Sequence, residues 1–382
     1  MWRRISVTLA VAITVALAAS AGCREESKGA SLQRQTVIPA LAGDSQGPPS
    51  RSFAMGWGFT PPVPSVEAVI DIIPRIAEVS EFTIIQREVP WSRLKAGVGI
   101  NQVLDEDWDG LVQYLRGNDL RLVILIDPLN GLDRTEEANE ARANGVTLLD
   151  TGARATHEAF VLEVARRYQP EYLGLASEIN TLAAHGDPQL YAALRDMING
   201  LLPRLREVSP DSKLFVSHQV DDAWGLSGRP SNVEDQFKLV HDFPGTDVVG
   251  LSSYPGFFWD RPEDIPGGYY ERYVTESGRP VIQVEGGWST ERTSWMAPTR
   301  EASPASQARY LQRLWQLLDE VDAELLVLLT YADLDLSWPE WGLSEDDHAG
   351  LLNFARMGIV DTSLRPKPSF SVWASMYALP LR

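Results

Sequence analysis

The sequence predicts an α/β fold, a single-domain (β/α)8 TIM barrel. Eight short apolar segments rich in β-branched residues recur along the chain, and each is followed by a helical or amphipathic segment. A doubly wound sheet is disfavoured, because such sheets usually carry a Gly-rich phosphate-binding turn after the first strand. Here Pro61 and Pro62 follow the first strand, and proline has no N–H group to offer a phosphate.

The eight predicted strands are apolar runs bounded by turn-forming or polar residues, as expected for the buried strands of a parallel sheet. They cover residues 53–59, 82–87, 122–126, 172–178, 214–218, 247–252, 280–285 and 324–331. Apolar residues at helical spacing predict helices near 66–79, 103–116, 156–168, 233–242, 269–275 and 368–377. Two further helices are predicted to begin at Asp187-Pro188 and Ser303-Pro304, because Asp and Ser favour the N-cap and Pro the first helical position.

The first 23 residues have the features of an export signal. A basic start at Arg3 and Arg4 precedes an apolar stretch over 7–19, which is short for a membrane-spanning helix. The segment ends in Ser-Ala-Gly-Cys at Cys23, the only cysteine of the chain, and resembles a bacterial lipoprotein signal, in which that cysteine is lipidated. Ser20 stands where such signals usually have Leu. The alternative is a general secretory signal and a secreted protein.

Residues 24–50 are mostly polar or small and are expected to form a flexible linker between the signal and a catalytic domain at 51–382. We therefore expect an exported protein of the cell envelope, held at a membrane only by a lipid on Cys23. The formal net charge of −18 argues against nucleic acid as a partner, since a polyanion would be repelled.

Two predicted strands end in a glutamate, an unusual residue for an apolar strand unless its side chain leaves the core at the strand's end. Glu178 ends the fourth strand (YLGLASEIN) and Glu285 ends the seventh (PVIQVEGG). In a closed barrel both would project from the C-terminal face, where barrel enzymes have their active sites. Two carboxylates facing across a cleft are what glycosidic bond cleavage requires, one as proton donor and one as nucleophile.

The segments LGLASEIN, DVVGLSSYP and PVIQVEGGWS together resemble the retaining (β/α)8 glycoside hydrolases, with GIVDTSLRPKPSF similar to their closing segment. In that superfamily strand four carries the acid/base Glu and strand seven the nucleophile Glu. The resemblance implies that Glu178 is the acid/base and Glu285 the nucleophile. The SSYP and EGGWS pieces are most similar to endo-β-1,4-galactanases and related endo-glycanases. Many of these families place Asn before the acid/base Glu, whereas this chain has Ser177 there and Asn180 two residues beyond it.

Several other residues are candidates for contact with a sugar. Tyr254 matches the position from which these enzymes aim a phenol at the nucleophile; the alternative is a tyrosine that packs its loop. Arg87, at the end of strand two, is expected to keep Glu285 ionised, or to form a structural salt bridge. His218, at the end of strand five, is either a sugar-binding donor or a core histidine. Strand-end tryptophans that are candidates for stacking on sugar rings are Trp57, Trp288, Trp338 and Trp341.

Other chemistries find little support. The histidines and the single cysteine show no metal-ligand spacing, and no G-x-S-x-G nucleophile elbow is present. We therefore expect a monomeric hydrolase of poly- or oligosaccharides that needs no metal or organic cofactor. A non-catalytic carbohydrate-binding lipoprotein on a degenerate barrel is the alternative, but such a protein would have no need of both glutamates.

Overall fold

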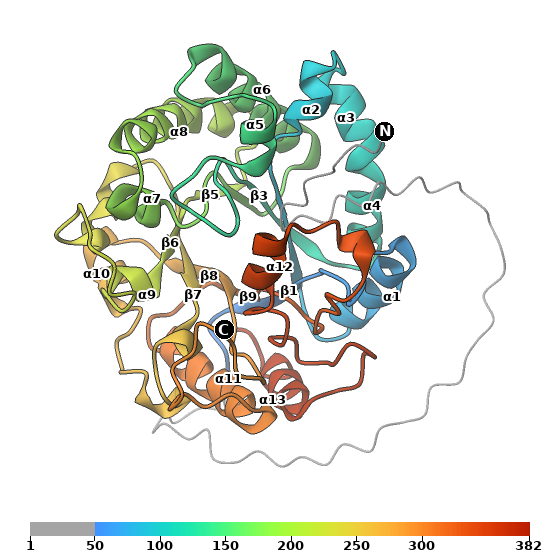
Figure 1. The fold of residues 1–382 in the computed structure, drawn as a ribbon, viewed down its shortest axis with the longest axis vertical. Coiled ribbons are helices and arrows are strands. Elements are labelled where there is room, and N and C mark those ends of the chain that lie inside the picture. The colour runs from blue at the N-terminus through green and yellow to red at the C-terminus, as the bar shows by residue number, and fades with distance from the viewer. Residues whose placement is uncertain (1–49) are drawn as a thin grey trace.

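The computed structural model describes residues 50–382. Nine parallel strands form one sheet, in the order β5-β4-β3-β2-β1-β9-β8-β7-β6. Helices surround the strands (Figure 1). The strands are β1 Ala54–Gly58, β2 Phe82–Arg87, β3 Arg121–Ile126, β4 Tyr172–Gly174, β5 Lys213–Phe215, β6 Ser217–Gln219, β7 Val249–Ser253, β8 Val281–Gly286 and β9 Leu325–Leu328.

The two outermost strands of this order, β5 and β6, are consecutive in sequence and separated only by Val216. They are two halves of one strand, which pairs with β4 through its first half and with β7 through its second. Backbone hydrogen bonds continue across the break, because Gly250 N–H donates to the carbonyl of Val216 at 3.0 Å. The sheet therefore closes on itself, and the predicted (β/α)8 barrel is confirmed with the fifth strand interrupted once.

Most predicted helices are present, and the expected caps form: Asp187 accepts from Gln189 N–H at 2.8 Å, and Ser303 accepts from Ser306 N–H at 3.0 Å. The helix expected over 103–116 is broken at Trp108, and the one expected over 233–242 is a 3₁₀ helix, η1. The helices are α1 Val66–Ala77, α2 Trp91–Lys95, α3 Ile100–Asp107, α4 Asp109–Gly117, α5 Asn139–Ala143, α6 Thr151–Tyr168, α7 Ile179–His185, α8 Pro188–Val208, α9 Val220–Ala223, η1 Gln236–Asp242, η2 Pro255–Phe257, η3 Pro262–Asp264, α10 Glu271–Ser277, α11 Pro304–Asp319, η4 Pro339–Trp341, α12 Glu345–Leu351 and α13 Pro368–Tyr377.

The strands are buried on both faces, as expected for a parallel barrel. One face of the sheet packs against the surrounding helices in the largest apolar cluster of the described residues. The other face fills the barrel interior with Ala54, Phe82, Ile84, Val123, Leu125, Tyr172, Phe215, Val248, Ile282, Val284, Leu325 and Val327. The interior is thus a packed core, so that any binding site must lie at one end of the barrel.

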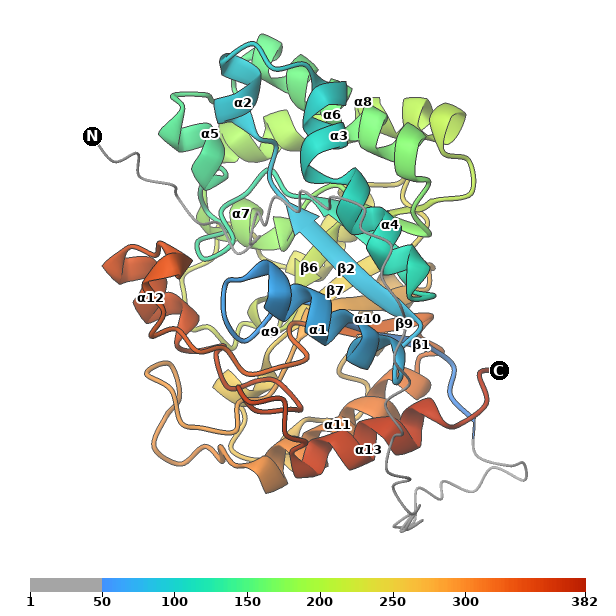
Figure 2. The ribbon, with the colours of Figure 1, turned by 90° about the vertical axis from the view of Figure 1, so that its right-hand side faces the viewer.

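The segment between β9 and α13, residues 329–367, reaches over the C-terminal end of the barrel. Its η4 and α12 build a small apolar cluster from Leu334, Trp341 and Leu351, and Leu132 of the β3–α5 loop packs against it. Figure 2 shows α12 on the side toward which the β2 arrow points. The β3–α5 loop and the segment after β9, which are far apart in sequence, thus contact each other at one side of the C-terminal end of the barrel.

No helix within residues 50–382 is long and apolar enough to cross a membrane. The predicted export signal with Cys23, and the predicted linker up to residue 49, lie outside the described residues.

Candidate active site

Glu178 stands at the point where the β4 segment turns into α7. It is the N-cap residue of α7, with φ 48° and ψ 41°, a left-handed conformation that costs a non-glycine residue of order 1–2 kcal/mol. The surrounding structure holds it there, because the backbone N–H of Glu178 donates to Ser217 Oγ at 2.9 Å. This backbone conformation is therefore maintained by the contact between the β4–α7 turn and β6.

Glu285 reaches the same end of the barrel through an irregularity in β8. Gln283 pairs with Leu251, but Glu285 pairs with the next residue, Ser252, so that Val284 is an extra residue in the ladder. Without this bulge, strict alternation would turn Glu285 toward the helices, as it does Gln283. With the bulge, Glu285 lies on the side of Ser252, whose hydroxyl donates to Glu178 Oε1 at 2.5 Å.

One buried arginine connects the two glutamates. Arg134, from the loop between β3 and α5, places Nε 3.2 Å from Glu178 Oε2 and Nη2 3.6 Å from Glu285 Oε2. Its Nη1 donates to Asp127 Oδ2 at 2.6 Å, and Asp127 directly follows β3. Nε and Nη2 are neighbouring nitrogens on one edge of the guanidinium group. The two glutamates therefore lie next to each other along that edge.

Tyr254 completes the surroundings of Glu285. Its hydroxyl donates to Glu285 Oε1 at 2.6 Å, so the carboxylate contacts Arg134 through one oxygen and a phenol through the other. Tyr254 is held from behind by the buried Asp221, which accepts from the Tyr254 backbone N–H at 2.7 Å and from the Tyr269 hydroxyl at 2.6 Å. The phenol is therefore fixed before any substrate binds.

The charges of the site are coupled. Burial and the nearby Glu178 carboxylate raise the pKa of Glu285, Arg134 and the Tyr254 hydroxyl act in the opposite direction, and the resulting pKa is about 7. Burial alone would lower the pKa of Arg134, but Asp127, Glu178 and Glu285 outweigh burial and raise it. Arg134 therefore stays charged, and the ionisation of Glu285 depends on the charges of Glu178 and Arg134 beside it.

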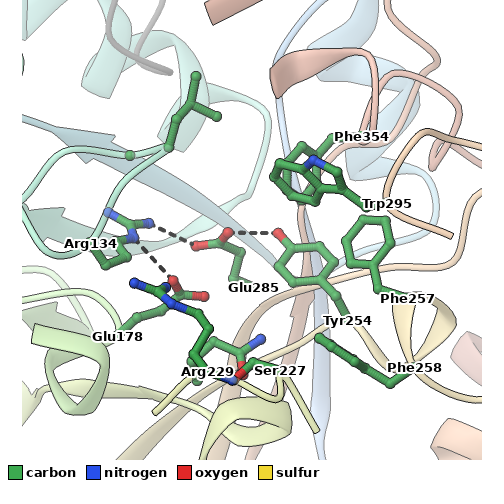
Figure 3. Close-up of a pocket in the computed structure, with 13 residues that line it drawn as sticks. Arg134, Glu178, Ser227, Arg229, Tyr254, Phe257, Phe258, Glu285, Trp295 and Phe354 are labelled. Carbon is green, nitrogen blue, oxygen red and sulfur yellow. Dashed lines mark hydrogen bonds and ion pairs between the residues drawn. The ribbon is translucent and has the colours of Figure 1, made fainter. Parts of the chain in front are cut away.

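The glutamates face a cavity of about 550 Å³. One wall is aromatic, with Phe257, Trp295 and Phe354 in edge-to-face contact at centroid distances of 5.5–5.7 Å. The opposite side is polar (Figure 3). The lining residues are Gly131, Leu132, Arg134, Glu178, Gln219, Ser227, Arg229, Tyr254, Phe257, Phe258, Glu285, Trp295 and Phe354. An aromatic wall beside convergent polar groups is typical of sites that bind sugars, whose rings have apolar faces and polar edges.

Of the residues singled out from the sequence, the structure brings Glu178, Glu285 and Tyr254 together, and it corrects the placement of Arg87. The Arg87 guanidinium donates to the carbonyl of Asp107 at 2.9 Å and lies 4.9 Å from the centre of the Trp108 ring. It therefore turns outward to the helices and does not contact Glu285. Arg134 has the position expected of Arg87.

Asn180 and His218 also lie outside the cavity lining. Asn180 is fully buried. Its Nδ2 donates to the Gln219 carbonyl and to Gln236 Oε1, and its Oδ1 accepts from the Gln219 backbone N–H. These bonds leave the side chain no role toward a sugar. His218 is 1 % exposed and packs 5.6 Å from the ring of Tyr273; burial lowers its pKa to about 3, so it stays neutral. Both are interior residues because their strand and helix turn those positions toward the outer layer.

The four tryptophans expected to stack on sugars do not line the cavity either. Trp57 is buried against Trp373 at 4.4 Å, and Trp288 is buried with its Nε1 donating to the carbonyl of Glu301 at 3.1 Å. Trp341 and Trp338 both lie on the segment that follows β9, where Trp341 is buried in its apolar cluster and Trp338 is 45 % exposed. Trp295, 49 % exposed, is the tryptophan that faces the cavity.

Sequence reasoning missed Arg134, Asp127, Ser252 and Arg229. Ser252 ends a predicted strand and Asp127 directly follows one, and that position alone was a usable signal. Arg134 and Arg229 lie in irregular loops, where no periodicity indicates the direction of a side chain. No group of three or more His, Cys, Asp or Glu side chains within the described part of the chain is arranged to hold a metal ion.

No protein-family model matches the chain, and no curated protein matches it in sequence. Solved structures do match. The chain resembles the exo-β-1,4-mannosidase Op5Man5 from Opitutaceae bacterium strain TAV5 with a TM-score of 0.59 at 14 % identity, over 86 % of this chain and 59 % of that one. It resembles a GH5_18 protein from Bifidobacterium longum subsp. longum with a TM-score of 0.61 at 13 % identity, over 87 % and 81 %.

Fungal β-1,4-galactanases match with a TM-score of 0.54 at 14 % identity, over 81 % of this chain and 91 % of theirs. The comparison shows a barrel fold similar to that of these solved structures. The resemblance predicted from the sequence is thus confirmed at the level of the fold, and galactanases are among the neighbours. The chain spans about three fifths of the length of the mannosidase.

Proposed function

We propose that the chain is a glycoside hydrolase that cleaves O-glycosidic bonds of a poly- or oligosaccharide by a retaining double displacement. The observation that carries the proposal is the pair of glutamates, on β4 and β8 segments, held side by side in one cavity by Arg134. Retaining enzymes keep their carboxyl groups about 5–5.5 Å apart, whereas inverting enzymes need about 6.5–9.5 Å to admit a water between them. Two carboxylates sharing one guanidinium edge suit the shorter distance.

Glu285 is the nucleophile in this proposal. Arg134 and the Tyr254 hydroxyl both stabilise its ionised form, and ionisation is what attack on the anomeric carbon requires. Glu178 is the acid/base: it protonates the leaving oxygen during formation of the glycosyl-enzyme ester, then takes a proton from the water that hydrolyses the ester. The proposed acid step needs a protonated Glu178, and a protonated Glu178 has no negative charge to oppose the ionisation of Glu285.

The test compares two variants on activated aryl glycosides and natural glycans. Glu285→Ala should abolish turnover of all substrates, because no other group is placed to form the ester. Glu178→Ala should retain formation of the ester from an aryl substrate, whose leaving group needs no proton, and azide should restore the second step by attacking the ester. Glu67→Gln, an exposed change on α1, is the matched control and should leave turnover unchanged.

The stereochemistry decides the mechanism independently of the variants. The first product observed by proton NMR should have the anomeric configuration of the substrate. Inversion, or equal loss in both variants without azide rescue, would contradict the assignment of roles. Sugar binding by a wild-type protein that turns over no glycoside would favour the carbohydrate-binding alternative.

We also propose that the protein is exported and anchored in the cell envelope by a lipid on Cys23. The support is the basic and apolar N-terminal sequence that ends in a small-residue run before this cysteine. Wild-type protein should fractionate with membranes, and Cys23→Ser should release it or block its processing. A wild-type protein that is fully soluble and begins at another residue would contradict the anchor.

A further inference from the structure

Arg229 is a cavity-lining cation without a partner. Among the interactions of residues 50–382, its guanidinium takes part in no hydrogen bond, ion pair or ring contact, and only its backbone N–H is engaged, by Ser227 Oγ at 3.3 Å. The other arginine of the lining, Arg134, is committed to three carboxylates. Arg229 is therefore the one cation of the described cavity lining that is available to a ligand.

The loop that carries Arg229 is anchored on both sides of it. Ser227 Oγ donates to Asp222 Oδ1 at 2.6 Å, and on the other side the carbonyl of Pro230 lies 2.8 Å from His185 Nδ1. His185 ends α7, the helix that begins after Glu178. Figure 3 shows the Arg229 side chain extending from this loop toward the Glu178 carboxylate. The loop that carries Arg229 is thus fixed, while the Arg229 side chain itself is exposed at the cavity.

The charges of the cavity lining do not pair off completely. The charged residues of the lining are two glutamates and two arginines. Both glutamates and Asp127 are engaged by Arg134, so that the positive charge of Arg229 has no carboxylate partner among the described residues, in a chain of net charge −18. A neutral sugar would leave this cation unmatched, whereas an anionic group would pair with it through the bidentate geometry that guanidinium offers.

We propose that the substrate is an anionic sugar, carrying a carboxylate or a sulfate ester that Arg229 binds next to the bond to be cleaved. This inference rests on the proposed function. Charge-assisted hydrogen bonds contribute about 1.5–3 kcal/mol, which corresponds to about 10- to 150-fold in kcat/KM. Arg229 therefore determines specificity between anionic and neutral sugars and takes no part in bond cleavage.

The experiment uses matched 4-nitrophenyl β-glycosides in the gluco, galacto and manno series, each as the uronide, the 6-sulfate and the neutral sugar. Wild-type protein should prefer the uronide or the 6-sulfate of one series by tenfold or more, and which of the two is preferred identifies the anion. Arg229→Gln should lower kcat/KM for that substrate by about 10- to 100-fold and for its neutral counterpart by less than threefold. Arg195→Gln, which removes an exposed arginine of α8 paired only with the neighbouring Asp196, is the charge-matched control and should change neither.

A binding experiment separates this inference from the proposed function. Glu285→Gln protein is titrated by NMR with the methyl uronides, methyl 6-sulfates and neutral methyl glycosides of the three series. If no aryl glycoside is turned over but an anionic glycoside binds and Arg229→Gln removes that binding, the hydrolase proposal fails and the anion site stands. A preference for neutral sugars, an equal loss on both classes in Arg229→Gln, or absence of anion binding would overturn the inference.

Discussion

Replacing Arg134 by methionine tests how the site keeps its nucleophile ionised. Among residues 50–382, Arg134 is the only cation that lies against Glu285, at 3.6 Å, and methionine keeps much of its side-chain volume. At an effective dielectric constant of about 20, two unit charges at that distance interact by about 4–5 kcal/mol. Measured carboxyl groups beside an arginine have pKa values lowered by about 1–3 units. Loss of Arg134 should therefore raise the pKa of Glu285 from about 7 by a similar amount.

The sign of the effect follows from the role of Glu285. A nucleophile reacts when ionised, so on an activated aryl glycoside the wild-type rate should rise with pH through about 7 and then level off. In Arg134→Met this rise moves to higher pH. At pH 6 to 7 kcat/KM should fall by about 10- to 1000-fold, and the deficit should narrow as the pH is raised toward 9.

Two controls separate electrostatics from structure. Arg134→Lys retains a charge without the planar fork and should recover part of the loss at pH 7. Both variants also change the buried partner of Asp127, which can destabilise the fold. Thermal unfolding therefore identifies any variant that fails to fold. A deficit of constant size from pH 5 to 9 in folded protein, or none at all, would refute the electrostatic role of Arg134.

Three further predictions follow from the same contacts. Glu178→Gln removes the negative charge that raises the pKa of Glu285, so the rise of kcat/KM with pH on an aryl substrate should move below about 7; an unmoved profile would show that the two groups are not coupled. Tyr254→Phe loses the 2.6 Å hydrogen bond to Glu285 and should lower kcat by about 10- to 100-fold in steady-state assays, with unchanged unfolding. Arg87→Met loses the Asp107 carbonyl and the Trp108 ring and should lower the free energy of unfolding in urea by about 1–2 kcal/mol. Its kcat should stay within twofold of wild type, and a large drop in kcat would place Arg87 in the site after all.

Some features of this protein follow from local sequence alone. Strand and helix periodicity, with Asp187 and Ser303 as caps, is local information, and it predicted the barrel and the position of Glu285 at the end of a strand. Glu178 was predicted to end the fourth strand, but β4 ends at Gly174 and Glu178 is the N-cap of α7. Because every strand of a parallel barrel ends at the same face, the two glutamates had to converge once the fold was known. Tyr254, two residues past Ser252, was predicted because it follows the sixth predicted strand and because its segment resembles that of the glycoside hydrolases.

Tertiary structure alone decided which side chains reach the cavity. The bulge that turns Glu285 inward arises from the pairing between β7 and β8. The sequence of one strand alone does not determine how that strand pairs with its neighbour. Trp57 and Trp295 are the same residue type, yet one is buried in the outer layer and the other is exposed at the cavity, since burial depends on what packs against each. Arg134, not Arg87, contacts the glutamates because a loop without periodicity follows a path set by its anchors, here Asp127 beneath it and the segment after β9 that packs on Leu132.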